Sequence, residues 1–301
     1  MKEDRPLISF ILITYNQESF VKDALNGAFS QTYSPLEIIV ADDGSKDNTA
    51  KVIEEAIAEY NGPHKVVFHR GNPNVGIAQN TNNAMALANG VFFMLAAGDD
   101  KSLPERARRT YELFTQYPEL TCINFNSIPC DASLHPLVKA DNKSNSLSSI
   151  NIHDYIELAD FVLWSGDARS VRRSLYDAFG PFTKGKDEDS SLFIRGLLAG
   201  SVCHSQEYMS LRRIHEQQVS NFKNIRKHVS EDFVAQPMLD IDTALQYGLI
   251  SERTASQMRW KVRHADRLLA DQYYQAVSPW YRALYAKPVD ILRRIKNKLF
   301  A

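Results

Sequence analysis

The sequence predicts an α/β fold, in which a mostly parallel β-sheet is flanked by helices and followed by a helical C-terminal extension. Four strand-like runs alternate with helical patterns from residue 7 to residue 117, the first of them an apolar run without polar alternation, and no strand-like run occurs beyond about residue 220. Such runs are typical of strands covered on both faces, and their alternation with helices favours a parallel sheet.

Each element of the first 100 residues has its own signal. The run "LISFILI" has the length of a buried strand, and apolar residues then recur at helical spacing after residue 20 and again after residue 50, where Gly62 ends the pattern. A weaker, Asn-rich pattern indicates the third helix. The predicted strands cover residues 7–13, 36–41, 65–70 and 91–97, and the predicted helices cover residues 20–29, 52–60 and 77–88.

The remaining elements are predicted from fewer signals. A helix is expected over 104–117, starting at Pro104, and a strand over 120–126. Residues 131–151 are rich in Ser, Asn and Asp and are expected to form a long loop. A helix with acids in its first turn is expected over 188–200, and the chain beyond about 220 has helical patterns throughout.

Composition excludes several classes of protein. The 301 residues carry a formal net charge of -1, which argues against a generally basic nucleic-acid binder. The three cysteines are odd in number and lack metal-site spacing, so we expect a reducing cytoplasm and neither a disulfide framework nor a zinc cluster. The N-terminus matches neither a signal peptide nor a membrane span.

Polar residues follow the predicted strands at their carboxyl ends, where parallel sheets bind ligands. They occur at 14–16, 42–45, 72–76 and 99–100, so acids and amides should converge on one edge of the sheet. No GxGxxG motif follows the first strand, and no GxxxxGK[ST] motif occurs. Any negative charge of a bound phosphate must therefore be offset by groups other than those two glycine-rich loops.

Four stretches together resemble the family 2 glycosyltransferases, which are inverting enzymes with a GT-A fold, a Rossmann-like sheet with flanking helices. They are "ISFILITYNQESFVKDALNGAFSQTYSPLEIIVADDGSKDNT", "NVGIAQNTNNAMALANGVFFMLAAGDDKSLPER", "GPFTKGKDEDSSLFIRGLLAG" and "LRRIHEQQVS". The resemblance covers about residues 7–220 in the family's order. It implies a catalytic domain over 1–220, with a nucleotide-sugar half over 1–103 and an acceptor half over 104–220, and a separate helical extension over 221–301.

The resemblance implies a nucleotide site, with UDP as the expected nucleotide. Tyr15 would stack near uracil and Asp43 would accept the uracil N3 proton, which suits a planar base with an imide N–H. The residues that the resemblance assigns to nucleotide binding are Thr14, Tyr15, Asn16, Asp42, Asp43, Asn80 and Asp99. Read alone, residues 42–45 are also a turn with a helix cap, Tyr15 is also a rim aromatic, and Asn80 is also an exposed helix polar.

The stretch "AAGDD" resembles the family's metal-binding acidic motif, with Ala97 where the first acid usually stands. The resemblance implies that Asp100 and Asp99 bind Mn²⁺ or Mg²⁺, and that His215 and Arg213 approach the metal or the diphosphate. A hard cation would offset two adjacent carboxylates, which otherwise repel each other. Capping of the helix near Pro104 is the alternative role for both aspartates.

The resemblance also implies the reaction, in which a sugar moves from a nucleotide donor to an acceptor hydroxyl with inversion. Asp189 would be the catalytic base and Glu188 the second candidate, although acids at a helix start also favour the helix dipole. The expected acceptor is a glycan or a lipid-linked molecule in polysaccharide or other cell-surface glycan synthesis, and no nucleic acid is involved. A nucleotidyltransferase and a non-catalytic nucleotide-sugar binding module remain the alternatives.

The segment 279–301 contains six Lys or Arg and one acid, with apolar residues on one helical face. Such a helix can lie on the inner face of the membrane, as a peripheral contact of a cytoplasmic protein, or dock on the catalytic domain.

Overall fold

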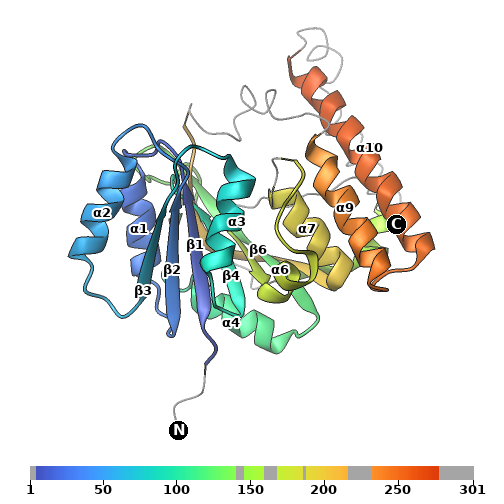
Figure 1. Ribbon diagram of the computed structural model, residues 1–301, viewed down its shortest axis with the longest axis horizontal. Coiled ribbons are helices and arrows are strands. Elements are labelled where there is room, and N and C mark those ends of the chain that lie inside the picture. The colour runs from blue at the N-terminus through green and yellow to red at the C-terminus, as the bar shows by residue number, and fades with distance from the viewer. Residues whose placement is uncertain (1–4, 140–145, 159–167, 186–187, 216–231, 278–301) are drawn as a thin grey trace.

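The four strands predicted from the first 100 residues form the parallel half of one sheet (Figure 1). The computed structural model describes residues 5–139, 146–158, 168–185, 188–215 and 232–277. Within these ranges, the strand order begins β3-β2-β1-β4, and each neighbouring pair is parallel. The strands are β1 (Ile8–Thr14), β2 (Leu36–Asp42), β3 (Lys65–Arg70) and β4 (Phe92–Ala97).

Helices cover both faces of this half, as expected for a parallel sheet. The helices α1 (Val21–Phe29) and α2 (Thr49–Glu59) pack on one face, whereas α3 (Ile77–Leu87) packs on the other. Alternate residues of β1 enter the two resulting cores, with Phe10 and Leu12 on the α1 side and Ile11 on the α3 side. The predicted positions of these helices and strands are confirmed.

The second half of the sheet is mixed and contains elements that the sequence patterns did not predict. The order continues β8-β6-β9-β5, with β7 paired to β9, and β8 is antiparallel to both β4 and β6. The elements in chain order are β5 (Lys101–Ser102), α4 (Arg106–Gln116), β6 (Leu120–Cys130), β7 (Leu147–Ile150), α5 (Ile152–Glu157), β8 (Arg169–Arg172), α6 (Arg173–Phe179), α7 (Glu188–Ala199) and β9 (Ser201–Arg213).

The expectation of one long loop over 131–151 was wrong, because β7 lies inside it and pairs antiparallel with β9. Strand β9 was missed as well. It runs parallel to β6 over most of its length, with register shifts at three places. Its sequence, "SVCHSQEYMSLRR", mixes polar and apolar residues because only some of its side chains are buried.

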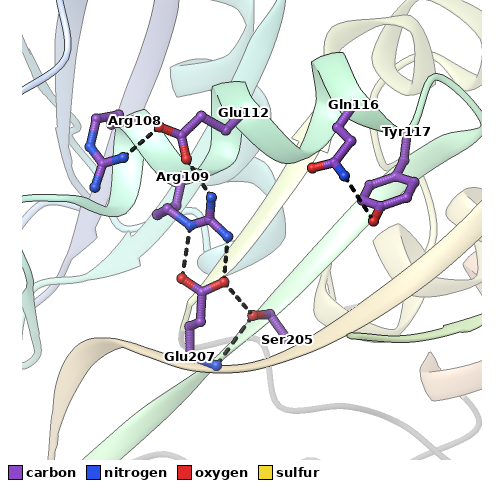
Figure 2. A network of polar contacts seen from close by, with 7 residues as sticks. All are labelled: Arg108, Arg109, Glu112, Gln116, Tyr117, Ser205 and Glu207. Atoms are coloured by element: carbon purple, nitrogen blue, oxygen red, sulfur yellow. Dashed lines mark hydrogen bonds and ion pairs between the residues drawn. The ribbon is translucent and has the colours of Figure 1, made fainter. Parts of the chain in front are cut away.

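An ion-pair network ties β9 to α4 (Figure 2). The Arg109 guanidinium donates to both carboxylate oxygens of Glu207, at 2.8 and 2.6 Å, and also pairs with Glu112 on its own helix. Ser205 receives a hydrogen bond from the Glu207 backbone. The hydrogen bonds that Arg109 donates to Glu207 raise the pKa of Arg109 and keep it charged. This two-pronged contact fixes the middle of the strand whose end reaches the candidate site.

The helix α9 (Asp232–Gln246) packs beside α7, and α10 (Glu252–Val277) packs against α9 (Figure 1). Their buried residues, Ile241, Ala244, Ala255, Met258 and Val262, belong to the same hydrophobic cluster as α7. The predicted helical extension is therefore present and is docked on the sheet domain over its described residues. None of the described helices is long and apolar enough to cross a membrane. The basic segment 279–301 lies outside the described residues.

Candidate active site

The ends of β1 and β2 meet side by side, which brings two of the predicted polar clusters together. Thr14 is in register with Asp42, and the Asp42 carboxylate accepts the backbone N–H of Ser45 at 3.0 Å and also binds its hydroxyl. Asn16 has a left-handed backbone, with φ of 51°, and its side chain accepts the backbone N–H of Lys46 at 2.8 Å. Asp42 thus caps its own turn, as the alternative interpretation had it, while lying at the predicted edge.

The Asp43 carboxylate holds the loop before α3. Its two oxygens accept the backbone N–H groups of Val75 at 2.8 Å and Gly76 at 2.9 Å, and the residue is only 4% exposed. Gly76 has a φ of 87°, which an L side chain rarely adopts. Tyr15, by contrast, is 39% exposed at the same edge. A buried acceptor and an exposed aromatic face therefore occur together.

Asn80 is fully buried, unlike the exposed helix polar that the alternative interpretation described. Its Nδ2 donates to the carbonyl of Ala41 at 2.9 Å, just before the Asp42–Asp43 pair, and its Oδ1 has no hydrogen-bond donor among the described residues. The residue supports the end of β2 from within the protein.

The stretch after β4 brings four predicted residues together. Asp100 Oδ1 accepts the backbone N–H of Arg213 at 2.8 Å, and Asp99 Oδ2 lies 3.1 Å from His215 Nε2. Both aspartates are buried, and the Asp99 side chain is 12% exposed. A side chain at Gly98 would come within 2.7 Å of Thr14, so the glycine allows β4 to end against β1.

The Arg213 guanidinium is engaged within the protein, where the resemblance had it approach a metal or a diphosphate. It donates to the Asp99 carbonyl at 2.7 Å and the Ala132 carbonyl at 2.8 Å, pairs with Asp23, and lies 4.8 Å from the Phe20 ring centroid. These contacts favour a role in fixing the Asp99–Asp100 turn. Asp23, on α1, was not among the sequence candidates, and nothing in its local sequence distinguishes it.

The acidic groups fit a divalent cation that shares its ligands with a substrate. Carboxylate oxygens and an imidazole nitrogen suit Mn²⁺, and carboxylates suit Mg²⁺, which binds through one or two of them plus substrate phosphates. Among the described residues, no group of three or more His, Cys, Asp or Glu side chains is arranged to hold a metal by itself. Asp99 and Asp100 therefore fit the metal role only as partial ligands.

The predicted catalytic acids begin α7, and a buried arginine fixes one of them. Arg169, which is 1% exposed, donates through Nη1 to the Asp189 carbonyl and lies 3.4 Å from Asp189 Oδ1. Its Nε donates to the Asn124 side chain at 2.8 Å, while the Asp189 side chain is 47% exposed. The carboxylate is therefore oriented yet accessible. No local signal in "DARSVRR" distinguishes Arg169, so the sequence candidates did not include it.

Comparisons with known proteins identify the family and the fold. The family model described as "Glycosyl transferase family 2" matches residues 9–175. An uncharacterised protein of Mycobacterium tuberculosis is 32% identical over 116 residues, 38% of this chain and 33% of the relative. An uncharacterised glycosyltransferase of Rickettsia typhi is 27% identical over 221 residues, 72% of this chain and 66% of the relative. The chain thus spans about a third of the first relative and about two thirds of the second.

Two solved structures share the fold. Staphylococcus aureus TarS in complex with UDP has a TM-score of 0.57 at 17% identity, covering 84% of this chain and 69% of that one. The mannosyltransferase PcManGT of Pyrobaculum calidifontis, in complex with GDP-mannose and Mn²⁺, has a TM-score of 0.55 at 15% identity, covering 99% and 88%. The GT-A fold is therefore confirmed, and since the family model matches more than half of the sequence, the chain belongs to glycosyl transferase family 2.

Proposed function

We propose that the chain transfers a sugar from a UDP-sugar to an acceptor hydroxyl with inversion, using a divalent cation. The observation that carries the proposal is the convergence of Asp42–Asp43 and Asp99–Asp100 at the carboxyl ends of β2 and β4, the two strands that flank β1, beside the exposed Tyr15. A nucleoside diphosphate presents both a planar base and concentrated negative charge. Tyr15 and Asp43 would bind the base, and a cation held by Asp99 and Asp100 would offset the charge. TarS, a structural neighbour, binds UDP and UDP-N-acetylglucosamine.

The base would lie against Tyr15, with its imide N–H donated to Asp43. An ionised carboxylate offers about four acceptor sites, and the two backbone amides that Asp43 accepts leave capacity for a third donor. Thr14, Asn16 and Asp42 would shape the neighbouring wall, and Asn80 would support β2 from beneath.

Asp100 and Asp99 would hold Mn²⁺ or Mg²⁺, with His215 alongside. When bound, the cation would neutralise the diphosphate as it leaves. His215 contacts Asp99 and also packs against the Phe20 ring, with 4.8 Å between ring centroids. Arg213 would act as a positioning residue, because its guanidinium holds the Asp99 carbonyl and its backbone N–H holds Asp100.

Asp189 would take the proton of the acceptor hydroxyl as its oxygen attacks the anomeric carbon, and Glu188 would be the alternative base. The start of α7 and the nearby Arg169 both favour the ionised carboxylate that a base requires. One base and one displacement give inversion. The proposed acceptor is a glycan or a lipid-linked molecule of cell-surface glycan synthesis; the chain matches 12% of the chondroitin synthase of Pasteurella multocida at 30% identity.

Calorimetry tests the donor site. UDP should bind with an affinity that depends on Mn²⁺, and Asp100→Ala should abolish that dependence, whereas Asp99→Ala should weaken it. Equal UDP affinity in Mn²⁺ and in EDTA would contradict the metal role. A thermal-shift screen with UDP-glucose, UDP-galactose and UDP-N-acetylglucosamine would then select the donor, and release of UDP from it would exclude a non-catalytic binding module.

A further inference from the structure

Residues 180–184, here named the strap, lead from α6 toward the acidic start of α7. Both α3, from the nucleotide half, and α9, from the C-terminal extension, hold the backbone of the strap. Neither contact involves the candidate donor or metal residues. The strap therefore connects the C-terminal helices to the catalytic end of α7.

On the α3 side, Asn82 binds Phe182 in both directions. Its Oδ1 accepts the Phe182 backbone N–H at 2.8 Å, and its Nδ2 donates to the Phe182 carbonyl at 2.8 Å. Asn82 is 4% exposed and Phe182 is 6% exposed. Two hydrogen bonds to one residue fix both the position and the orientation of that peptide segment.

On the α9 side, Gln236 holds the next two residues of the strap. Its Oε1 accepts the backbone N–H groups of Thr183 at 2.8 Å and Lys184 at 2.9 Å, and its Nε2 donates to Asp240 Oδ1 at 2.8 Å. Gln236 and Asp240 are each at most 2% exposed. Because these residues lie four apart on one helix, they share a face and act together.

Asp240, on α9, links this helix to α7 through an ion pair with Arg195. Its carboxylate binds Arg195 at 2.8 and 3.0 Å, and Arg195 Nη1 donates to the carbonyl of Gly180, at the other end of the strap, at 2.8 Å. The guanidinium carbon lies 4.5 Å from the Phe182 ring centroid. The network thus closes on itself through α9, α7 and the strap, and its side chains on α7 and α9 are buried.

We propose that Asn82 and Gln236 are positioning residues that set the strap and, through it, the carboxylates of Glu188 and Asp189. The proposal rests on the proposed function, and it gives α9 a part in turnover. A buried ion pair contributes little net stability compared with apolar packing, but a fully satisfied polar network specifies one arrangement. The strap ends four residues before α7 begins, so a displaced strap would displace the base and leave the donor contacts in place.

The test compares turnover with donor binding in the full-length protein. Gln236→Met and Asn82→Leu remove the polar contacts at similar side-chain volume, on different helices. Val262→Ala is the control, because Val262 is buried in α10, within the cluster shared with α7, and makes no hydrogen bond to the strap. The measurements are UDP release from the UDP-sugar selected above, UDP affinity in Mn²⁺, and hydrogen exchange at the amides of Thr183 and Lys184, all well below the melting temperatures.

Both strap variants should lower kcat by about ten- to a hundredfold, the cost of a misplaced catalytic group, with UDP affinity within about twofold of wild type. Val262→Ala should lower the melting temperature and keep kcat. If amide exchange at 183 and 184 accelerates while kcat stays at the wild-type value, the positioning role is wrong. A loss of UDP affinity as large as the loss of kcat would also overturn it. A wild-type rate of transfer by Asp189→Asn would refute the proposed base and not the positioning role. The positioning role would then be judged from the kcat values of the two strap variants alone.

Discussion

Replacing Arg213 by Met distinguishes a positioning role from direct contact with phosphate. The substitution removes the donor to the Asp99 carbonyl and leaves the methylene stem to pack on Phe20. Asp99 is 8% exposed, so its carbonyl would lose its partner inside the protein, at a cost of about 1–3 kcal/mol. Asp23 and Ala132 are exposed enough to regain water, and the lost cation–π contact adds about 0.5–1 kcal/mol.

The expected loss is therefore about 1.5–4 kcal/mol of unfolding free energy, out of about 5–15 kcal/mol for a typical domain. Urea denaturation measures it. Arg212→Met is the matched control, since neighbouring residues of a strand point to opposite faces. UDP affinity should fall in Mn²⁺ and match wild type in EDTA, because the variant disturbs only the carboxylate turn. A stability within about 0.5 kcal/mol of wild type, or an equal loss of UDP affinity in EDTA, would refute the reasoning.

Three further predictions concern the base, a buried histidine and the C-terminal segment. Arg169→Gln removes a cation next to the Asp189 carboxylate. The variant should bind UDP in Mn²⁺ as wild type does, release UDP about 10- to 100-fold more slowly, and show an acid limb of the pH–rate profile at higher pH. An unchanged pH–rate profile would contradict this prediction. Burial lowers the pKa of His64, so the unfolded chain gains a proton that the folded protein does not as pH falls below about 6.5, and stability present above that pH declines. Urea denaturation at pH 7.5 and 5.5 should show this decline, and His64→Gln should reduce it; an equal decline in the variant would assign it to other groups. Deleting 279–301 should preserve UDP release but reduce co-sedimentation with anionic vesicles at low salt, whereas a full-length protein that fails to co-sediment would remove the membrane proposal.

The parallel half of the fold was predictable because three of its four strands, β1, β2 and β4, are buried on both faces. Residues such as Ile11 and Ile39 must be apolar whichever way they point, so the runs are visible without a partner. The mixed half depends on pairing between distant residues, such as Asn124 of β6 with His204 of β9. Strand β8 has four residues, and two of them are arginines, one of which is buried. So short and polar a segment contains no apolar pattern that would predict a strand.

The candidate site likewise contains residues that the sequence predicts and residues that it does not. Acidic residues at strand ends can be recognised in the sequence, because Asp42–Asp43 follow one apolar run and Asp99–Asp100 follow another after a single glycine. The groups that hold them come from elsewhere in the chain: Arg169 reaches Asp189 across 20 residues, and Gln236 reaches the strap across 52 or more. Local sequence gives no reason to single out one buried arginine or glutamine among many.

Asp189→Asn tests the central claim of the proposed function, that the protein uses the first turn of α7 to deprotonate an acceptor hydroxyl. The variant should bind UDP in Mn²⁺ as wild type does, and its rate of UDP release from the selected donor should fall about 10²- to 10⁴-fold, the usual contribution of a positioned base. Glu188→Gln is the neighbouring control and should retain most of the rate. Near wild-type release by Asp189→Asn would contradict the account: loss in Glu188→Gln would move the base by one residue, and activity in both would place it outside α7.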